Sequence, residues 1–268
     1  MSNGAPSYHS QGLARGLRML RVLGQSRDPL TLAALAKQLD IAKPTLLRLL
    51  AVMERERFVV KAGNVPAYSL GPSILEVAES IGTIDFADIT SDTLKELADE
   101  LGFTTNLGVL HGRSVLHLAV EEPDRALRIA SGGYLDHTYC TALGKMLLSV
   151  LPMKEVDEHL PVSPEWESFT DHTITNRADF DAELQRIRDL GYSIDDQERN
   201  RGVRCMSVVV PLDGDSSLAI SASGPAGELD SSIAREVLTA LTTASEKFAD
   251  LPGFGPSLAA ARTRWGIE

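Results

Sequence analysis

Two short helical periods near the N-terminus, separated by about four residues, constrain the fold more than any other feature. In the stretch 31–58, apolar residues recur every three or four positions over 32–39, which predicts a short helix with Thr31 as its N-cap. A second period runs over 46–53, and Pro44 stands in the first turn, where its missing N–H costs little. Two short helices with such a connection are typical of a helix-turn-helix.

The outward face of the second predicted helix carries the candidate DNA contacts. With the apolar positions of 46–53 inward, the rotation of about 100° per residue turns Arg48 outward, with Thr45 and Leu47 beside it. A solvated arginine on an ordinary helical hairpin would give the same pattern. Lys43 and Pro44 at the start of this helix are added, and so is Lys61, which is expected near the tip of the following hairpin. The candidates are therefore Lys43, Pro44, Thr45, Leu47, Arg48 and Lys61.

Charge is distributed unevenly along the 268 residues, whose net charge is −11. Residues 1–80 hold ten Lys/Arg and six Asp/Glu, a net of +4, and the remainder holds sixteen and thirty-one, a net of −15. This asymmetry is expected where only the first part contacts phosphates. No apolar run approaches the ~18 residues of a membrane span, and no secretory signal is recognisable, so we expect a cytoplasmic protein. Two distant cysteines argue against a disulfide framework, and no histidine spacing predicts a metal site.

Turn residues and periodicity predict two domains. A polar tail over 1–10, expected to be disordered, precedes a winged helix-turn-helix over 11–71 and a linker helix over 72–83. Strand pairs interrupted by helices predict an α+β domain with a mainly antiparallel sheet over 84–251. The remaining segment, 252–268, is left as a C-terminal tail. The first helix is predicted to place four leucines on one side: Leu13, Leu17, Leu20 and Leu23. The predicted strands include 104–110, 115–120, 127–130, 203–211 and 218–224.

A series of motifs in a fixed order resembles the IclR (isocitrate lyase regulator) family of bacterial transcriptional regulators. The N-terminal motifs are GLARGL at 12–17, KPTLLRLL at 43–50 and YSLG at 68–71. The C-terminal motifs are NLGVL at 106–110, CTALGK at 140–145, GYSIDD at 191–196, GVRC at 202–205 and SASGP at 221–225. No single motif is specific, but together they extend over nearly the whole chain.

The resemblance implies an N-terminal winged helix-turn-helix, a linker helix and a C-terminal GAF-like effector-binding domain, assembled as a homodimer or homotetramer. It implies a DNA-binding transcription regulator, which we expect to be a repressor of a catabolic operon. A small organic acid is expected to modulate its binding to operator DNA, with no cofactor and no membrane partner. The family often has serine and a polar residue where this chain has Pro44 and Leu47. Leu47 cannot hydrogen-bond a base edge, but it can pack against a thymine methyl, so we expect some preference for T at that contact. Replacing that thymine by uracil tests the expectation.

The same resemblance places the effector pocket at Ala142, Leu143, Asp195, Cys205, Ser221 and Ser223. Ser221 and Ser223 are two apart on a predicted strand, so their hydroxyls share one face of the sheet. Unbonded N–H groups at a helix start near Ala142 favour a carboxylate. Taken singly, alternating serines also fit a solvent-facing edge, an aspartate fits a turn, and a cysteine fits inert packing.

A small-molecule hydrolase is the alternative function. Cys205 would be its nucleophile, with His137 or His172 as the base and Asp195 orienting that base. The local sequence places no histidine beside Cys205, which argues against a nucleophile there. The family resemblance also favours a regulator over an enzyme.

Overall fold

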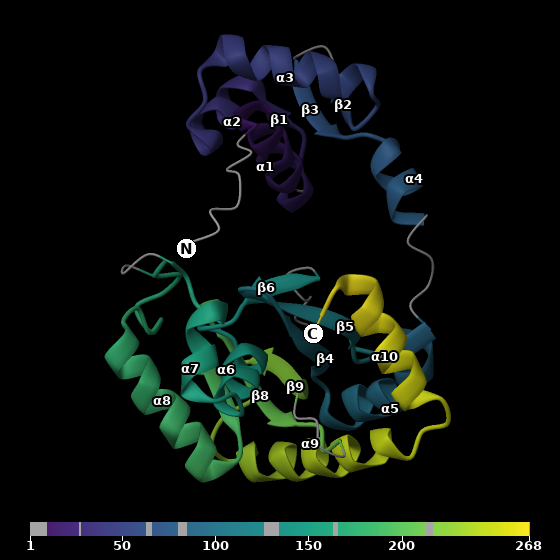
Figure 1. Ribbon diagram of the computed structural model, residues 1–268, viewed down its shortest axis with the longest axis vertical. Coiled ribbons are helices and arrows are strands. Elements are labelled where there is room, and N and C mark those ends of the chain that lie inside the picture. The colour runs from purple at the N-terminus through teal and green to yellow at the C-terminus, as the bar shows by residue number, and fades with distance from the viewer. Residues whose placement is uncertain are drawn as a thin grey trace, which may run out of the picture. The chain divides into compact units, whose positions relative to one another are not determined.

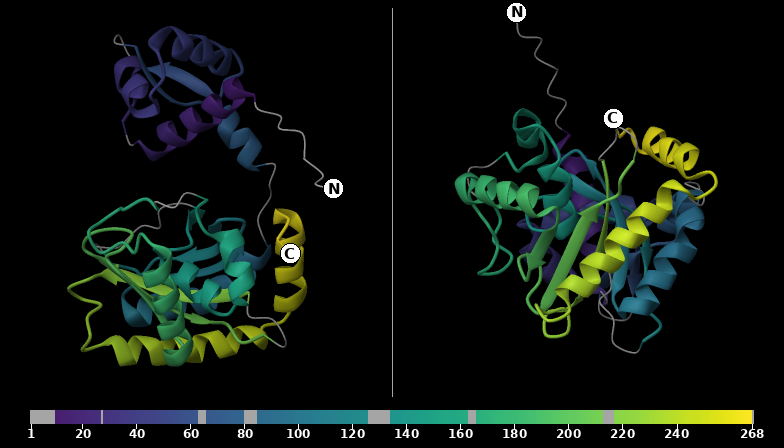
Figure 2. Two further views of the ribbon diagram at one scale, coloured as in Figure 1. Left: turned by 60° about the vertical axis from the view of Figure 1, so that its left-hand side comes forward. Right: turned by 90° about the horizontal axis from the view of Figure 1, so that it is seen from below.

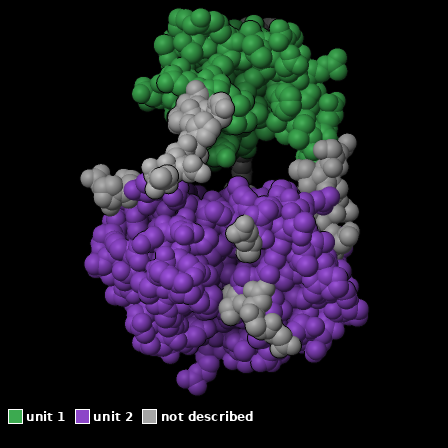
Figure 3. All heavy atoms as spheres, viewed as in Figure 1, with its two compact units in different colours: residues 1–82 green, residues 83–268 purple. Residues whose placement is uncertain are grey.

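The chain forms two compact units, residues 1–82 and 83–268, in a computed structural model (Figures 1 and 3). The structure describes residues 10–26, 28–62, 66–79, 85–125, 134–162, 166–212 and 217–267. The predicted tail up to residue 9, the end of the linker helix and the predicted strand at 127–130 lie outside these ranges. In the described part of the chain, no helix is long and apolar enough to cross a membrane.

The first unit is a winged helix-turn-helix, as the sequence predicts. Its elements are α1 (Gln11–Gln25), β1 (Leu30–Thr31), α2 (Leu32–Leu39), α3 (Lys43–Arg55), β2 (Val59–Ala62), β3 (Ala67–Leu70) and α4 (Ser73–Glu79). The strands pair antiparallel in the order β1-β3-β2. Thr31 caps α2, because its Oγ1 accepts a hydrogen bond from the N–H of Ala34 at 3.2 Å.

A small apolar core holds the three helices of this unit together. Leu46 and Leu50 of α3 are fully buried in it, which confirms the predicted inward face. In α1, Met19 and Leu23 are buried and Leu20 packs against the core, so only the C-terminal part of the predicted leucine side reaches the core. Leu13 is 63% exposed and Leu17 is 53% exposed.

In its described residues, the second unit contains a six-stranded antiparallel sheet covered by helices, in agreement with the predicted α+β domain with a mainly antiparallel sheet. Its helices are α5 (Asp85–Leu101), α6 (Ala142–Ser149), α7 (Met153–Val156), the 3-10 turn η1 (Asp157–His159), α8 (Arg177–Leu190), α9 (Ala234–Ala249) and α10 (Phe254–Trp265). Its strands are β4 (Thr104–His111), β5 (Ser114–Glu121), β6 (Leu135–His137), β7 (Ser193–Asp196), β8 (Val203–Val209) and β9 (Leu218–Pro225), in the order β6-β5-β4-β9-β8-β7.

Helices cover both faces of the sheet (Figure 2), and an apolar core lies on each face. On one face, α5 and α9 pack against the sheet, whose side chains there include Leu107 and Ile220, and α10 packs on α5 and α9. On the other face, α6 lies over β7, β8, β9 and β4, and α8 packs on α6. Side chains alternate between the two faces along a strand. Asn106 and Ser221, the neighbours of Leu107 and Ile220 in sequence, therefore point towards α6.

The C-terminal segment corrects one expectation. Residues 252–268, which the sequence left as a tail, contain the helix α10, and that helix belongs to the larger core. The ring of Phe254 stacks on Phe248 at a centroid distance of 5.8 Å and tilts against Phe86 at 5.3 Å. All three rings are buried, so α10 is an integral layer of the second unit.

Candidate DNA-contacting helix and effector pocket

The N-terminal half of α3 presents five of the six candidate DNA contacts. Lys43, Pro44 and Arg48 are exposed, Thr45 is half-buried, and Leu47 is 46% exposed. An exposed leucine next to two cationic side chains departs from the usual polar surface of a helix. This surface can therefore offer both charge and an apolar contact to a partner.

Lys61 lies next to the turn of the wing hairpin, in the strand and not in the turn itself. The sequence places it near a hairpin tip, and the structure places it within β2, paired with Tyr68 of β3. Its side chain is exposed, so it remains available to a partner on the wing.

All six candidate effector residues line one cavity of about 70 Å³ between α6 and the sheet. Ala142 and Leu143 come from the start of α6, and the other four come from three strands of the sheet. Eight further lining residues were not singled out from the sequence: Thr104, Asn106, His117, Asp136, Thr141, Arg199, Asn200 and Val203. The structure thus brings together residues that are up to 119 positions apart, from Thr104 to Ser223.

Two rows of polar residues cross the sheet beneath α6, and strand register defines both. The first row is Thr104, Ser223, Cys205 and Asp195. The second row is Asn106, Ser221, Ser207 and Ser193. Ser221 is only 2% exposed, so the alternative of a solvent-facing serine edge does not apply to it.

The N-terminus of α6 is held close to the cavity. Thr141 caps it, because its Oγ1 accepts from the N–H of Gly144 at 3.1 Å and donates to the carbonyl of His137 at 2.7 Å. A Cβ added at Gly144 would lie 2.2 Å from the carbonyl oxygen of Thr138, so only glycine allows this approach. The first backbone N–H groups of a helix have no partner within it, and they are donors for an anion.

Asp195 is the most buried carboxyl of the cavity, at 2% exposed. Its Oδ1 accepts from the backbone N–H of Glu198 at 2.7 Å and of Arg199 at 3.3 Å. Burial and then the charge of Glu198 raise the pKa of Asp195 to about 7. Arg199 in turn donates to Asp136 at 2.8 Å and lies over the ring of Phe169. The cavity therefore contains the Asp195 carboxyl, which is partly neutral near pH 7, and the Arg199 guanidinium, which is fixed by its hydrogen bond to Asp136.

Lys145 ties α6 to the turn that carries Asp195. It is 1% exposed, and its Nζ donates to Glu183 at 3.0 Å and to Glu198. Burial raises the pKa of Glu198, and the charge of Lys145 opposes that effect. Because Glu198 also donates its N–H to Asp195, this buried pair positions Asp195 relative to α6.

The chemistry of Cys205 does not suit a nucleophile. Burial raises the pKa of its thiol, and the charge of Asp195, its cross-strand partner, raises it further. The thiolate is the reactive form, so these surroundings suppress reactivity. Neither His137 nor His172 is among the residues described as lining the cavity, where the histidine is His117. Within the described residues, no group of three or more His, Cys, Asp or Glu could hold a metal ion.

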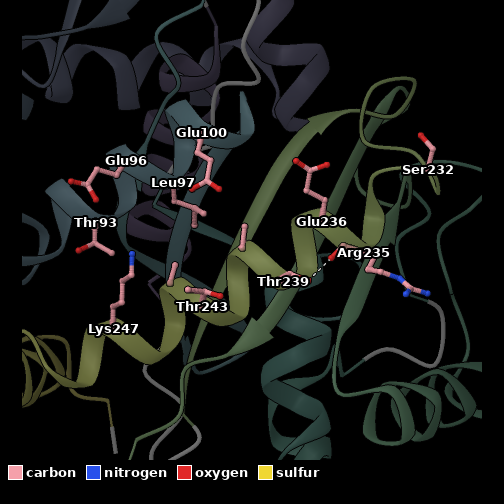
Figure 4. A pocket seen from close by; sticks show the side chains of 12 residues that line it. Thr93, Glu96, Leu97, Glu100, Ser232, Arg235, Glu236, Thr239, Thr243 and Lys247 are labelled. Carbon is pink, nitrogen blue, oxygen red and sulfur yellow. Dashed lines mark hydrogen bonds between the residues drawn. The ribbon is translucent and has the colours of Figure 1, made fainter.

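A larger groove of about 560 Å³ lies between α5 and α9, on the opposite face of the sheet (Figure 4). Thr93, Glu96 and Glu100 line it from α5, and Thr239 and Lys247 line it from α9. It contains none of the candidate effector residues. None of its lining side chains has a buried polar atom without a partner in the described structure, whereas the smaller cavity has two. The smaller cavity is therefore the better candidate site for a ligand.

The chain matches two protein-family models. The model for the bacterial transcriptional regulator IclR C-terminal domain matches residues 78–249, and the model for the IclR helix-turn-helix domain matches residues 12–63.

Curated relatives and solved structures agree with these matches. The HTH-type transcriptional regulator Rv1719 of Mycobacterium tuberculosis is 32% identical over 219 residues, which cover 81% of this chain and 83% of that protein. The HTH-type transcriptional regulator XynR of Escherichia coli is 28% identical over 202 residues, covering 75% and 80%. An IclR homologue of Microbacterium hydrocarbonoxydans, solved in complex with 4-hydroxybenzoate, has the same fold with a TM-score of 0.65. It is 19% identical, with 93% of this chain and 99% of that chain covered.

Proposed function

Because this chain belongs to the IclR family of bacterial transcriptional regulators, we propose that it represses a catabolic operon under the control of a small organic acid. The families and relatives that it matches are transcriptional regulators and not enzymes, and its helix-turn-helix is a DNA-binding domain. The single observation that carries the effector part is the cavity beneath α6, which all six candidate residues line.

Three features of the cavity support an organic acid. The N-terminus of α6 offers backbone donors to a carboxylate, and Ser221 and Ser223 add hydroxyls. Because the pKa of Asp195 is raised to about 7, its carboxyl is more than half protonated below pH 7 and repels an anion less there. The Microbacterium homologue was solved with 4-hydroxybenzoate, a carboxylic acid, so this fold can hold such a ligand.

On the DNA side, we propose that α3 enters the major groove with Lys43, Thr45, Leu47 and Arg48 forward, and that Lys61 approaches from the wing. One recognition helix reads only a few base pairs, so useful specificity requires at least two copies on a repeated half-site. The exposed leucines of α1, together with Leu75 of α4 at 65% exposed, supply apolar surface for a homodimer. We therefore propose a cytoplasmic homodimer, capable of pairing into a tetramer.

A gel shift with the DNA upstream of the protein's own coding sequence tests this function. Small organic acids that raise the thermal unfolding temperature would be selected first, because a ligand of the folded state stabilises it by mass action. We expect a sequence-specific complex that a selected acid weakens. Ser221→Ala and Cys205→Ser should reduce that response while leaving the complex itself in place. A protein that gives no sequence-specific shift, or a complex that responds to no acid, would contradict the proposal.

A further inference from the structure

The cavity has a second polar end, formed by Asn106 of β4 and His117 of β5. Asn106 is 3% exposed, and its Nδ2 donates to Ser221 Oγ at 3.3 Å and to Ser223 Oγ at 3.5 Å. Its Oδ1 is buried and accepts no hydrogen bond from any residue that the structure describes. The Nδ1 of His117 is in the same situation. Buried polar atoms are nearly always hydrogen-bonded, so two such atoms in one cavity indicate a ligand contact.

Strand register places these two side chains next to each other. Asn106 and Gly108 are two apart on β4, so they face the same side of the sheet. Gly108 pairs directly with His117 of β5, beyond an irregularity between Leu107 and Gly108. Asn106 and His117 are therefore diagonal neighbours on the face beneath α6, within reach of one small group.

A hydroxyl group satisfies both atoms. The Asn106 Oδ1 is an acceptor and needs a donor. Burial lowers the pKa of His117 and so favours its neutral imidazole, in which Nδ1 either donates or accepts according to the tautomer. A hydroxyl can donate to Asn106 and accept from His117, or donate to one of them while the other is met by a second hydroxyl. A methyl or methylene group can do neither.

We propose that the effector is a short aliphatic hydroxy acid, whose carboxylate meets the N-terminus of α6 and whose hydroxyl meets Asn106 and His117. This inference rests on the proposed function, since it takes the cavity to be the effector site. The small cavity and its lining favour an aliphatic skeleton. Its apolar lining consists of Ala142, Leu143, Val203 and Cys205, and no Phe, Tyr or Trp is among the described lining residues.

Titration calorimetry of the full chain with matched acids tests the inference. The probes are propionate, lactate and 3-hydroxypropionate, with benzoate and 4-hydroxybenzoate as the aromatic pair. We expect at least one aliphatic hydroxy acid to bind about tenfold or more tightly than propionate, because propionate leaves Asn106 unsatisfied. Equal affinities within about twofold, or tighter binding of an aromatic acid than of any aliphatic one, would overturn the inference.

Variants assign the preference to its residues. Asn106→Ala should bring the affinity ratio of hydroxy acid to propionate close to one, and His117→Ala should lower it while keeping the bonds between Asn106 and the two serines. Ser207→Ala is the matched control, because the Ser207 hydroxyl is also buried without a partner in the described structure but does not line the cavity. It should leave the ratio unchanged, and an equal loss in all three variants would show a general packing effect instead.

The two proposals fail differently. If acids bind and weaken the operator complex without any preference for a hydroxyl, the proposed function stands and only this inference fails. If no acid of the panel or of the thermal screen binds, the proposed function fails, and the inference fails with it.

Discussion

Arg48 is an exposed cation on the face of α3 that we assign to DNA, and its removal tests that assignment. We expect Arg48→Ala to weaken operator binding and to reduce the salt dependence of the binding constant by about one unit if the contact is to phosphate. If the contact is to guanine, discrimination between operator and mutated operator should fall by about 1–3 kcal/mol. Fluorescence anisotropy at several salt concentrations separates the two. Arg55→Ala is the control, since Arg55 is also exposed but lies in the last turn, paired with Glu56.

The raised pKa of Asp195 predicts the direction in which effector affinity changes with pH. Its pKa of about 7 means that the carboxyl gains charge between pH 6 and pH 8, and a bound carboxylate then meets a like charge. Four other charged groups lie near Asp195 or line the cavity: Asp136, Lys145, Glu198 and Arg199. Among the carboxyls that line the cavity, Asp195 is the buried one. We expect the affinity for an acid effector to fall as pH rises from 6 to 8. Asp195→Asn should flatten this profile in calorimetry, whereas the exposed Asp171→Asn should not.

The same shift acts on folding stability. The pKa of Asp195 is higher in the folded state than its ordinary value of 3.8, so the folded state binds a proton that the unfolded state has already released. The associated stability is fully present below about pH 4 and is lost as pH rises towards 7. Asp195→Asn should therefore lose less thermal stability than the wild type between pH 4 and pH 7. An identical loss in both proteins would contradict the raised pKa.

Residue identities in the cavity were only partly predictable from sequence. The six candidates come from motifs, and the structure brings them together. Asn106 lies within one of these motifs. It is two positions from Thr104 on a predicted strand, and this spacing could have identified both as polar residues on one face of the sheet. His117 could not be assigned, because its position depends on the irregularity at Leu107 and Gly108, which shifts the register of β5. A register set by tertiary packing leaves no periodic signal in the sequence.

At the scale of elements, α6 is the part of the cavity most sensitive to backbone position. Gly144→Ala would force its Cβ against Thr138, so α6 must move away from the preceding turn. We expect a loss of stability of about 1–3 kcal/mol in urea unfolding, together with weaker effector binding. Gly255→Ala in α10 is the control, because nothing lies within 4 Å of a Cβ there and alanine favours a helix. A Gly144→Ala variant as stable as this control would contradict the close approach.

The helix α10 could not be predicted from the local sequence. Gly253, Gly255 and Pro256 at its start are turn residues, so the local pattern favours a loop. The helix is stable because Phe254 and Leu258 reach a core made by distant segments. We expect Phe254→Ala to destabilise the protein by about 3–5 kcal/mol in chemical unfolding. Leu190→Ala, at a half-exposed site, should cost far less, and equal effects would mean that α10 does not contribute to the core.

At the scale of the whole molecule, the proposed dimer makes a separate prediction. Leu17 is exposed on α1, so Leu17→Glu should leave the thermal unfolding temperature of a single chain nearly unchanged. If α1 joins two copies, the variant should bind DNA with two half-sites much more weakly, while retaining the weak affinity for one half-site. Gel shifts on both DNAs, with sedimentation to measure the assembly, decide between these outcomes. Unchanged binding to both would place the dimer contact elsewhere.

In the second unit, one face of the sheet packs against the larger apolar core, and the face under α6 carries the two polar rows beside the smaller apolar core. Substitutions in the polar rows remove little buried apolar surface, so we expect them to change the free energy of unfolding of the domain only slightly. Ligand preference can therefore drift in evolution, or be changed in the laboratory, without first stabilising the scaffold. A combinatorial library restricted to Thr104, Asn106, Cys205, Ser221 and Ser223 should yield many folded variants with altered ligand choice. That property is what a designer of transcription-based biosensors would look for.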